Sequence, residues 1–296
     1  MPKIIAHYDF VHGRSNVEGA TKRATLQSAE DHGTATTSVA GGRADGALYG
    51  PAFDAGYLLA KTEDVTKVST TAPYRRRAVA QRTNQCALSA IHLQETPIEE
   101  DYYVAGLEWG EALGTDVVSS SVGYSNWWLY PDLDGKTSKP ARAVDAAVER
   151  SVVVVQAAGN RSIRGLDTPA DAQNAITVGA VTVAGELAIF SALGPTIDGR
   201  IKVCHTSREA ERSCAHWLNT YISYEKPDTC AMGFQVKVAN YLGEYKLASG
   251  YATREKLVIS GGNRPHSLTR IYVFCQNVVC NSVSCRCLCI DTTSAS

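Results

Sequence analysis

One amide side chain follows a strand of the buried type and could act on a bound ligand. The run Val152–Val155 consists of four β-branched residues, which is typical of a strand covered on both faces. Three small residues, Ala157, Ala158 and Gly159, then lead to Asn160. Ligands of open α/β sheets bind beyond the carboxyl ends of the strands. We therefore expect Asn160 to lie in a ligand site, although a plain turn residue is the simpler interpretation.

Two further stretches carry residues of the same kind. His32 is followed by small residues as far as Gly41-Gly42, which predicts a turn at the histidine and then a helix packed closely on its neighbours. Asp116–Gly123 predicts a strand that becomes serine-rich, so that its far end exposes polar backbone. The aromatic loop Asn126–Tyr130 comes next, and it could either pack on the core or line a cleft.

The elements that must position these residues alternate along the chain. Val144 and Ala147 share one helical face just before the Val152–Val155 strand, and the acids Glu99–Asp101 suit the start of another helix. This alternation predicts an α/β fold, a mostly parallel sheet with helices on both faces. The other expected elements are strands at Lys3–Phe10, Tyr57–Lys61 and Ala175–Val183, a helix at Tyr102–Leu113, and one weak strand at Ile271–Phe274.

Composition narrows the class of protein. The chain has 296 residues, a hydrophobic fraction of 44% and a formal net charge of −1, as expected for a globular protein. A charge this small gives no electrostatic case for nucleic acid or an anionic membrane. No run approaches the length of a membrane span, and the apolar start is too short for a signal peptide.

Two segments break the pattern. Residues 66–94 hold five Lys and Arg residues and no acid, without a helical or strand period. A basic arm that binds nucleic acid is one interpretation, but a poorly ordered insertion fits better. Residues 204–296 hold eight of the nine cysteines. We therefore expect one unit at 1–202, interrupted at 66–94, and an irregular Cys-rich tail at 203–296.

The tail could alternatively bind zinc. Cys204, His205, Cys214 and His216 are candidate ligands, and five later cysteines could join them. Their spacings are irregular, however, and no pair of C-x-x-C elements occurs. We therefore predict no metal site.

Five motifs in order resemble the subtilisin-like serine peptidases, or subtilases. Beside His32-Gly33-Thr34 with Gly41-Gly42, Ser120–Gly123 and Ala157–Asn160, the chain carries Ala175–Val181 and Phe190–Pro195 in family order. The resemblance covers about residues 3–65 and 95–202. It implies the subtilisin-like fold and the hydrolysis of peptide bonds.

The resemblance also implies a role for each matching residue. A serine nucleophile needs a histidine to take its proton, and His32 matches that general base. Asn160 matches the amide that donates to the developing oxyanion, a bond typically worth about 100- to 1,000-fold in turnover. Ser120, Ser121, Val122 and Gly123 match the edge that pairs with substrate backbone and walls the specificity pocket.

The departures from the family concern the other two catalytic residues. The family's aspartate lies in a D-T-G or D-S-G context, and its serine in G-T-S-x-A-x-P, but neither motif occurs here. Asp9 lacks the required context, and Asp31 adjoins His32 too closely to reach its ring from below. We therefore expect a subtilase domain truncated at its start and altered at its end, with negligible peptidase activity.

These observations leave two functions open. The first is a serine endopeptidase, as the family resemblance implies, that is inactive because this sequence lacks the aspartate and serine motifs. The second is a non-catalytic subtilase-like domain that binds extended peptides. The expected partner is a peptide or protein, with no nucleic acid and no membrane, and we expect a monomer. Calcium is common in the family, but no site can be assigned, and no cofactor is expected. The family suggests an extracytoplasmic protein.

The insertion at 66–94 and the tail at 203–296 both begin near a tripeptide whose codons can contain the start signal of an intron. Lys67-Val68-Ser69 and Lys202-Val203-Cys204 can be written with a GTA codon after AAG, and Gln94 can be written CAG. We therefore predict that residues 68–94 are translated intron and that transcripts spliced after Lys67 exist. Sequencing of full-length transcripts tests this prediction, and transcripts that all encode residues 68–94 would contradict it.

Overall fold

The central sheet carries every predicted strand and two segments of the tail. The computed structural model describes residues 3–17, 29–64, 95–162, 165–182, 184–200, 229–233, 236–239, 245–248, 257–258, 270–275 and 288–289. In this part of the chain, seven strands pair in the order β1-β4-β12-β5-β6-β7-β8, and every pair is parallel. Their bounds are β1 Lys3–Asp9, β4 Gly56–Lys61, β5 Val117–Ser121, β6 Val153–Ala157, β7 Ile176–Val181, β8 Thr229–Met232 and β12 Arg270–Cys275.

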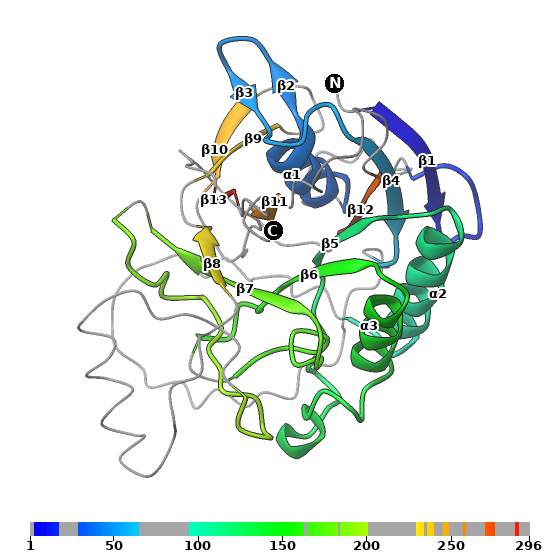
Figure 1. Ribbon diagram of the computed structural model, residues 1–296, viewed down its shortest axis with the longest axis vertical. Coiled ribbons are helices and arrows are strands. Elements are labelled where there is room, and N and C mark those ends of the chain that lie inside the picture. Colours follow the sequence, from blue (N-terminus) through cyan, green and yellow to red (C-terminus); the bar gives the residue numbers. More distant parts are fainter. Residues whose placement is uncertain are drawn as a thin grey trace, which may run out of the picture.

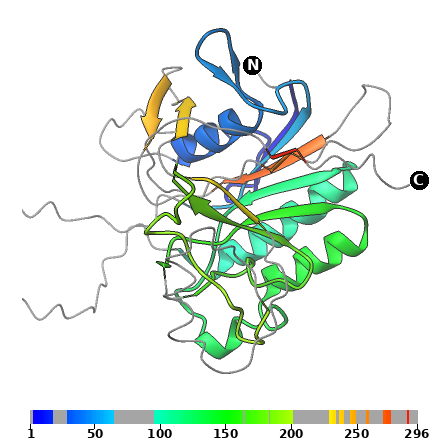
Figure 2. The same cartoon turned by 60° about the vertical axis from the view of Figure 1, so that its left-hand side comes forward.

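Helices cover both faces of this sheet, as the alternation predicted (Figure 1; Figure 2). Helix α1 lies on one face, and α2 and α3 lie together on the other. The remaining elements are α1 Ala29–Gly41, α2 Ile98–Ala112, η1 Tyr130–Asp132, α3 Lys139–Glu149 and the short strands β2 Arg43–Ala44, β3 Leu48–Tyr49, β9 Val236–Ala239, β10 Tyr245–Ala248, β11 Leu257–Val258 and β13 Leu288–Cys289.

Two-residue periodicity divides the apolar side chains between the two faces. Leu58 and Val118 pack toward α2 and α3, in the same cluster as Val144 and Ala147 of α3. Tyr57 and Val117, one residue earlier on each strand, belong to the cluster on the opposite face. The Val152–Val155 run supplies both clusters, which explains why it reads as a continuous apolar segment.

Helix α1 approaches the sheet through a glycine. A Cβ built on Gly41 would overlap the ring of Tyr57, which confirms the expected close packing. The helix begins at Ala29, however, so His32 lies inside its first turn. The prediction of a turn at His32 was therefore wrong.

The tail contributes more regular structure than its sequence predicted. The weak strand at Ile271–Phe274 is confirmed as β12, and it lies between β4 and β5 in the middle of the sheet. β8 extends the sheet beyond β7. These strands are short and carry no hydrophobic period, so only one of them could be found from sequence. The expected insertion at 66–94 and the cysteines and histidines at 204–216 lie outside the described residues.

The position of β12 makes the fold depend on the tail. In the substitution Val273→Pro, proline cannot donate to either neighbouring strand, which leaves a buried carbonyl without its partner at about 1–3 kcal/mol and adds a steric misfit. We expect a large loss in the free energy of unfolding, measured by urea denaturation. Lys237→Pro in the two-stranded β9–β10 sheet is the matched control and should cost less. Equal stability of Val273→Pro and the parent chain would contradict the arrangement.

Candidate active site

The predicted residues gather at the carboxyl edge of the sheet. Ser120 and Ser121 end β5, and Asn160 follows the end of β6 by three residues. His32 lies near the start of α1, the helix that follows β1, so it too belongs to this edge. The topology therefore brings all three predicted segments to one edge, although they are up to 128 positions apart in the chain.

The segment that matches the substrate edge is only partly accessible. Ser120 and Val122 are buried, and Val122 packs in the core with α2 and α3. Ser121 and Gly123 are half-buried and alternate with them. The ladder with β6 ends at Ser120, so the half-buried Gly123 is the part of this segment that a peptide backbone could approach.

A buried amide joins this segment to β6. The side chain of Gln156 is fully buried, and its Nε2 donates to the carbonyl of Val122 at 2.6 Å. Tyr103 donates to Gln156 Oε1 at 3.5 Å from the helix behind. The ends of β5 and β6, which carry the two predicted halves of the site, are therefore held in a fixed relation.

Asp167 fills the space between the two strand ends, and sequence reasoning did not identify it. A Cβ on Gly123 would lie 2.9 Å from Asp167 Cβ, and a Cβ on Gly159 would lie 2.9 Å from Asp167 Cγ. The Asn160 N–H and the Ser125 side chain both hydrogen-bond to its carboxylate. Both glycines are thus required by the close approach of one side chain, and Gly159 also needs its positive φ of 106°.

Burial dominates the charge state of this carboxyl group. Asp167 is 8% exposed, and desolvation raises its pKa to about 6, although the hydrogen bond from Ser125, the charge of Arg161 and the N–H of Asn160 all favour ionisation. The Arg161 guanidinium approaches only one oxygen, with 3.6 Å between Nη1 and Oδ1. None of the residues that the structure describes donates a hydrogen bond to Asp167 Oδ1.

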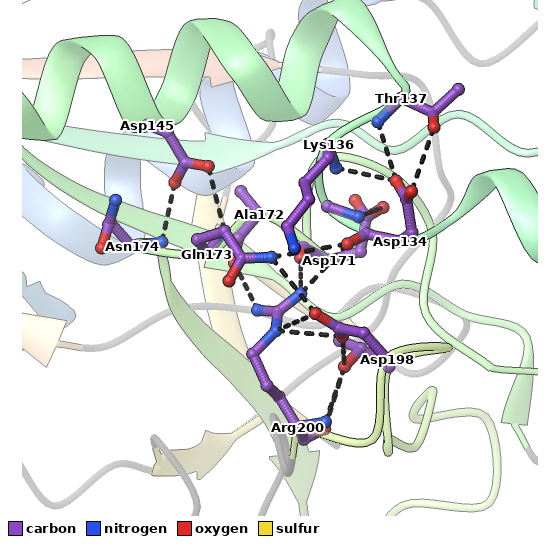
Figure 3. A network of polar contacts seen from close by, with 12 residues as sticks. Asp134, Lys136, Thr137, Asp145, Asp171, Ala172, Gln173, Asn174, Asp198 and Arg200 are labelled. Atoms are coloured by element: carbon purple, nitrogen blue, oxygen red, sulfur yellow. Dashed lines mark hydrogen bonds and ion pairs between the residues drawn. The ribbon is translucent and has the colours of Figure 1, made fainter.

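The segment that carries Asp167 is fixed at both of its ends. Tyr124 and Thr168 exchange backbone hydrogen bonds of 2.8 and 3.0 Å. Further on, Arg200 donates from Nη2 to the Asp171 carbonyl at 2.7 Å and from Nη1 to the Ala172 carbonyl at 3.2 Å (Figure 3). The guanidinium also pairs with Asp198, with 2.8 Å between Nε and Oδ2.

The start of α3 supports the same segment (Figure 3). Gly135 N–H donates to the buried Asp171 carboxylate at 2.8 Å, and Asp145 of α3 accepts from the N–H of Asn174 at 2.7 Å. Ser138 caps α3 by accepting from Ala141 N–H at 3.2 Å, and its hydroxyl also contacts the Thr168 hydroxyl. These hydrogen bonds therefore hold residues 167–174 in place next to the ends of β5 and β6.

The motif Phe190–Pro195 holds the Asn160 loop from the other side. Ala192 N–H donates to the Gly159 carbonyl at 2.9 Å, and Ser162 N–H donates to the Phe190 carbonyl at 3.1 Å. The motifs Ala157–Asn160 and Phe190–Pro195 are therefore in contact in the folded chain, although they are far apart in the sequence.

The aromatic loop packs on α2. Glu100 Oε1 accepts the indole N–H groups of Trp127 and Trp128, at 2.9 and 2.5 Å. The Tyr124 hydroxyl donates to Glu63 at 2.6 Å, and its ring lies 5.8 Å from that of Trp127. The packing interpretation therefore applies to the tryptophans, whereas Leu129 is 71% exposed at the tip of the loop.

Asp9 belongs to a different cluster, one of charged and polar side chains at the end of β1. It ends β1 at the margin of the sheet, and its buried carboxylate contacts His12 Nδ1 at 2.8 Å, Arg14 at 3.3 Å and Lys61 at 3.4 Å. Burial works to raise its pKa, but the bond with His12 and the charge of Lys61 hold the pKa below its ordinary value. Two strands, β4 and β12, separate β1 from β5.

A family model matches the part of the chain that carries the five motifs. The profile described as "Subtilase family" matches residues 3–208, so the chain belongs to the subtilase family.

Solved subtilisin-like proteinases are among the structural matches. A cold-adapted subtilisin-like serine proteinase matches at 20% identity and a TM-score of 0.49, over 85% of this chain and 64% of that one. The prenylagaramide maturation protease PagA matches at 16% and 0.44, over 76% and 58%. The chain thus spans less than two thirds of the length of either structure.

Neither a metal site nor a membrane span is found in the described part of the chain. No three His, Cys, Asp or Glu side chains there are placed to share a metal ion. Likewise, none of its helices combines the length and the apolar character that crossing a bilayer requires.

Replacing Asp167 by asparagine should change how stability depends on pH. The folded-state pKa of about 6 exceeds the ordinary value of 3.8, so the native state binds the extra proton between these values and stability falls as the pH rises through them. The amide of asparagine cannot ionise. We expect Asp167→Asn to be more stable than the parent by about 1–3 kcal/mol above about pH 7 and similar to it near pH 4.

Thermal or urea unfolding across this pH range measures the difference. Asp116→Asn is the control, because Asp116 is an exposed carboxyl group. A stability difference between Asp167→Asn and the parent that does not vary with pH would contradict the assignment.

Proposed function

We propose that this chain binds extended peptides at the edge formed by Ser120–Gly123 and Asn160, and that it hydrolyses them negligibly. The observation that carries the proposal is the pairing of the ends of β5 and β6 through Gln156 and Asp167. This pairing holds a segment in which Ser121 and Gly123 are half-buried beside the loop that carries the Asn160 amide. A fixed, partly exposed backbone edge is what an extended peptide needs for main-chain hydrogen bonds.

Within this proposal, His32 and Asn160 are the two residues of the peptidase mechanism that this chain retains. His32 is the general base and Asn160 the oxyanion donor, as the family implies. The sequence carries neither the aspartate motif nor the serine motif of the family, and the acid at the end of β1, Asp9, is paired with His12, Arg14 and Lys61. A general base without a nucleophile to activate gives little rate enhancement.

The absence of hydrolysis is tested with a fluorophosphonate probe, which reacts with activated serines. We expect no labelling of the purified chain and no cleavage of a fluorogenic casein substrate above the rate of the His32→Ala variant. Labelling that disappears in His32→Ala would show a working nucleophile and would overturn this part of the proposal.

Peptide binding is tested separately by fluorescence anisotropy with a dye-labelled extended peptide. Gly123→Ala places a methyl group 2.9 Å from Asp167 Cβ, which must displace the edge, so we expect binding to weaken about tenfold or more. Ser119→Ala, on the same strand but inside the ladder, should bind like the parent. A parent chain that shows no saturable binding would refute the proposed function.

A further inference from the structure

The proposed peptide edge lies against a group of acidic side chains. Asp167 occupies the space between Gly123 and Gly159. The carboxyl group of Glu95 lies close enough to those of Glu63 and Asp167 that their charges add to burial in raising its pKa well above the ordinary value. These three acids come from three separate segments of the chain, so their approach is a property of the fold.

The charge of Asp167 is incompletely compensated. Asp167 is only 8% exposed, and none of the described residues donates a hydrogen bond to its Oδ1. The neighbouring guanidinium of Arg161 stays 3.6 Å away, whereas charge-assisted hydrogen bonds are typically about 2.7–2.9 Å long. The Arg161 side chain is 34% exposed and stands on the loop just after Asn160, so it has solvent into which it can move.

We propose that Asp167 selects a lysine or arginine side chain in the bound peptide, and that Arg161 pairs with this carboxylate only until the peptide displaces it. The proposal rests on the proposed function, because it names the class of peptide that the same edge accepts. Asp167 is then a specificity-determining residue, and Glu95 and Glu63 add to the negative potential around it.

The selection follows from the cost of a buried charge. A largely buried carboxylate gains a charge-assisted hydrogen bond when a cationic side chain arrives, and it gains no hydrogen bond from an apolar one. A hydrogen bond to a charged group corresponds to a preference of about 10- to 100-fold. An acidic side chain at the same place meets like charge and should be rejected.

A structural role for Asp167 is the competing explanation. Its carboxylate also accepts from Ser125 and from Asn160 N–H, so it could serve only to hold the two strand ends together. Asparagine at this position keeps one oxygen acceptor and nearly the same shape. A merely structural role would therefore weaken binding of all peptides alike when Asp167 is changed to asparagine.

The experiment measures dissociation constants of the full chain by fluorescence anisotropy. The probes are dye-labelled alanine hexapeptides in which one residue is lysine, arginine, norleucine or glutamate, placed at each position in turn. At one position we expect lysine and arginine to bind about 10- to 100-fold more tightly than norleucine. Asp167→Asn should remove this preference while binding of the norleucine peptide persists.

Two further variants separate the explanations. Arg161→Gln removes the resident cation from an exposed position, so the lysine and arginine peptides should bind more tightly than they bind the parent. Asp101→Asn removes an exposed carboxylate of α2 that pairs with Lys139, and it should leave the preference unchanged.

Each outcome decides the proposal. Peptides that bind without preferring a cation at any position, or a preference that survives in Asp167→Asn, would overturn the role of Asp167 and leave the proposed function standing. Failure of every peptide to bind the parent would overturn both.

Discussion

The carboxylate of Asp167 between Gly123 and Gly159 is the contact on which the arrangement of the site depends. It takes the space that two side chains would otherwise fill, and it hydrogen-bonds to the loop after each strand. Burial raises its pKa to about 6, so above that pH the protein maintains a charge at a cost in stability. Groups kept at such a cost occur often at functional sites, because binding or catalysis needs them.

The rest of the edge keeps that side chain in place. Arg200, Asp145 and Asp171 fix residues 167–174, and Gln156 fixes the end of β5 to β6 (Figure 3). The bonds of Asp171 and Gln156 are buried, so breaking either would leave its partner unpaired, which costs more than the bond itself contributes. A substitution at Arg200 would therefore act on the site from a distance, through the position of Asp167.

The sequence predicted the layers of the fold well, and the site in part. Val152–Val155 and the α3 face of Val144 and Ala147 are local patterns, and the structure confirms both. Asp167 could not be found in this way, because its meaning lies in its contacts with glycines 44 and 8 positions away in the chain. The position of β12 in the sheet could not be predicted either, because no hydrophobic periodicity in the tail indicates with which strands β12 pairs.

Hydrogen exchange of backbone amides, followed by mass spectrometry with and without a lysine-containing peptide, shows directly whether a peptide binds beside Asp167. We expect the peptide to slow exchange in residues 121–125 and 159–162, which flank Asp167, and to leave α2 and α3 unaffected. Protection confined to other segments, or no protection at a saturating peptide concentration, would contradict this expectation.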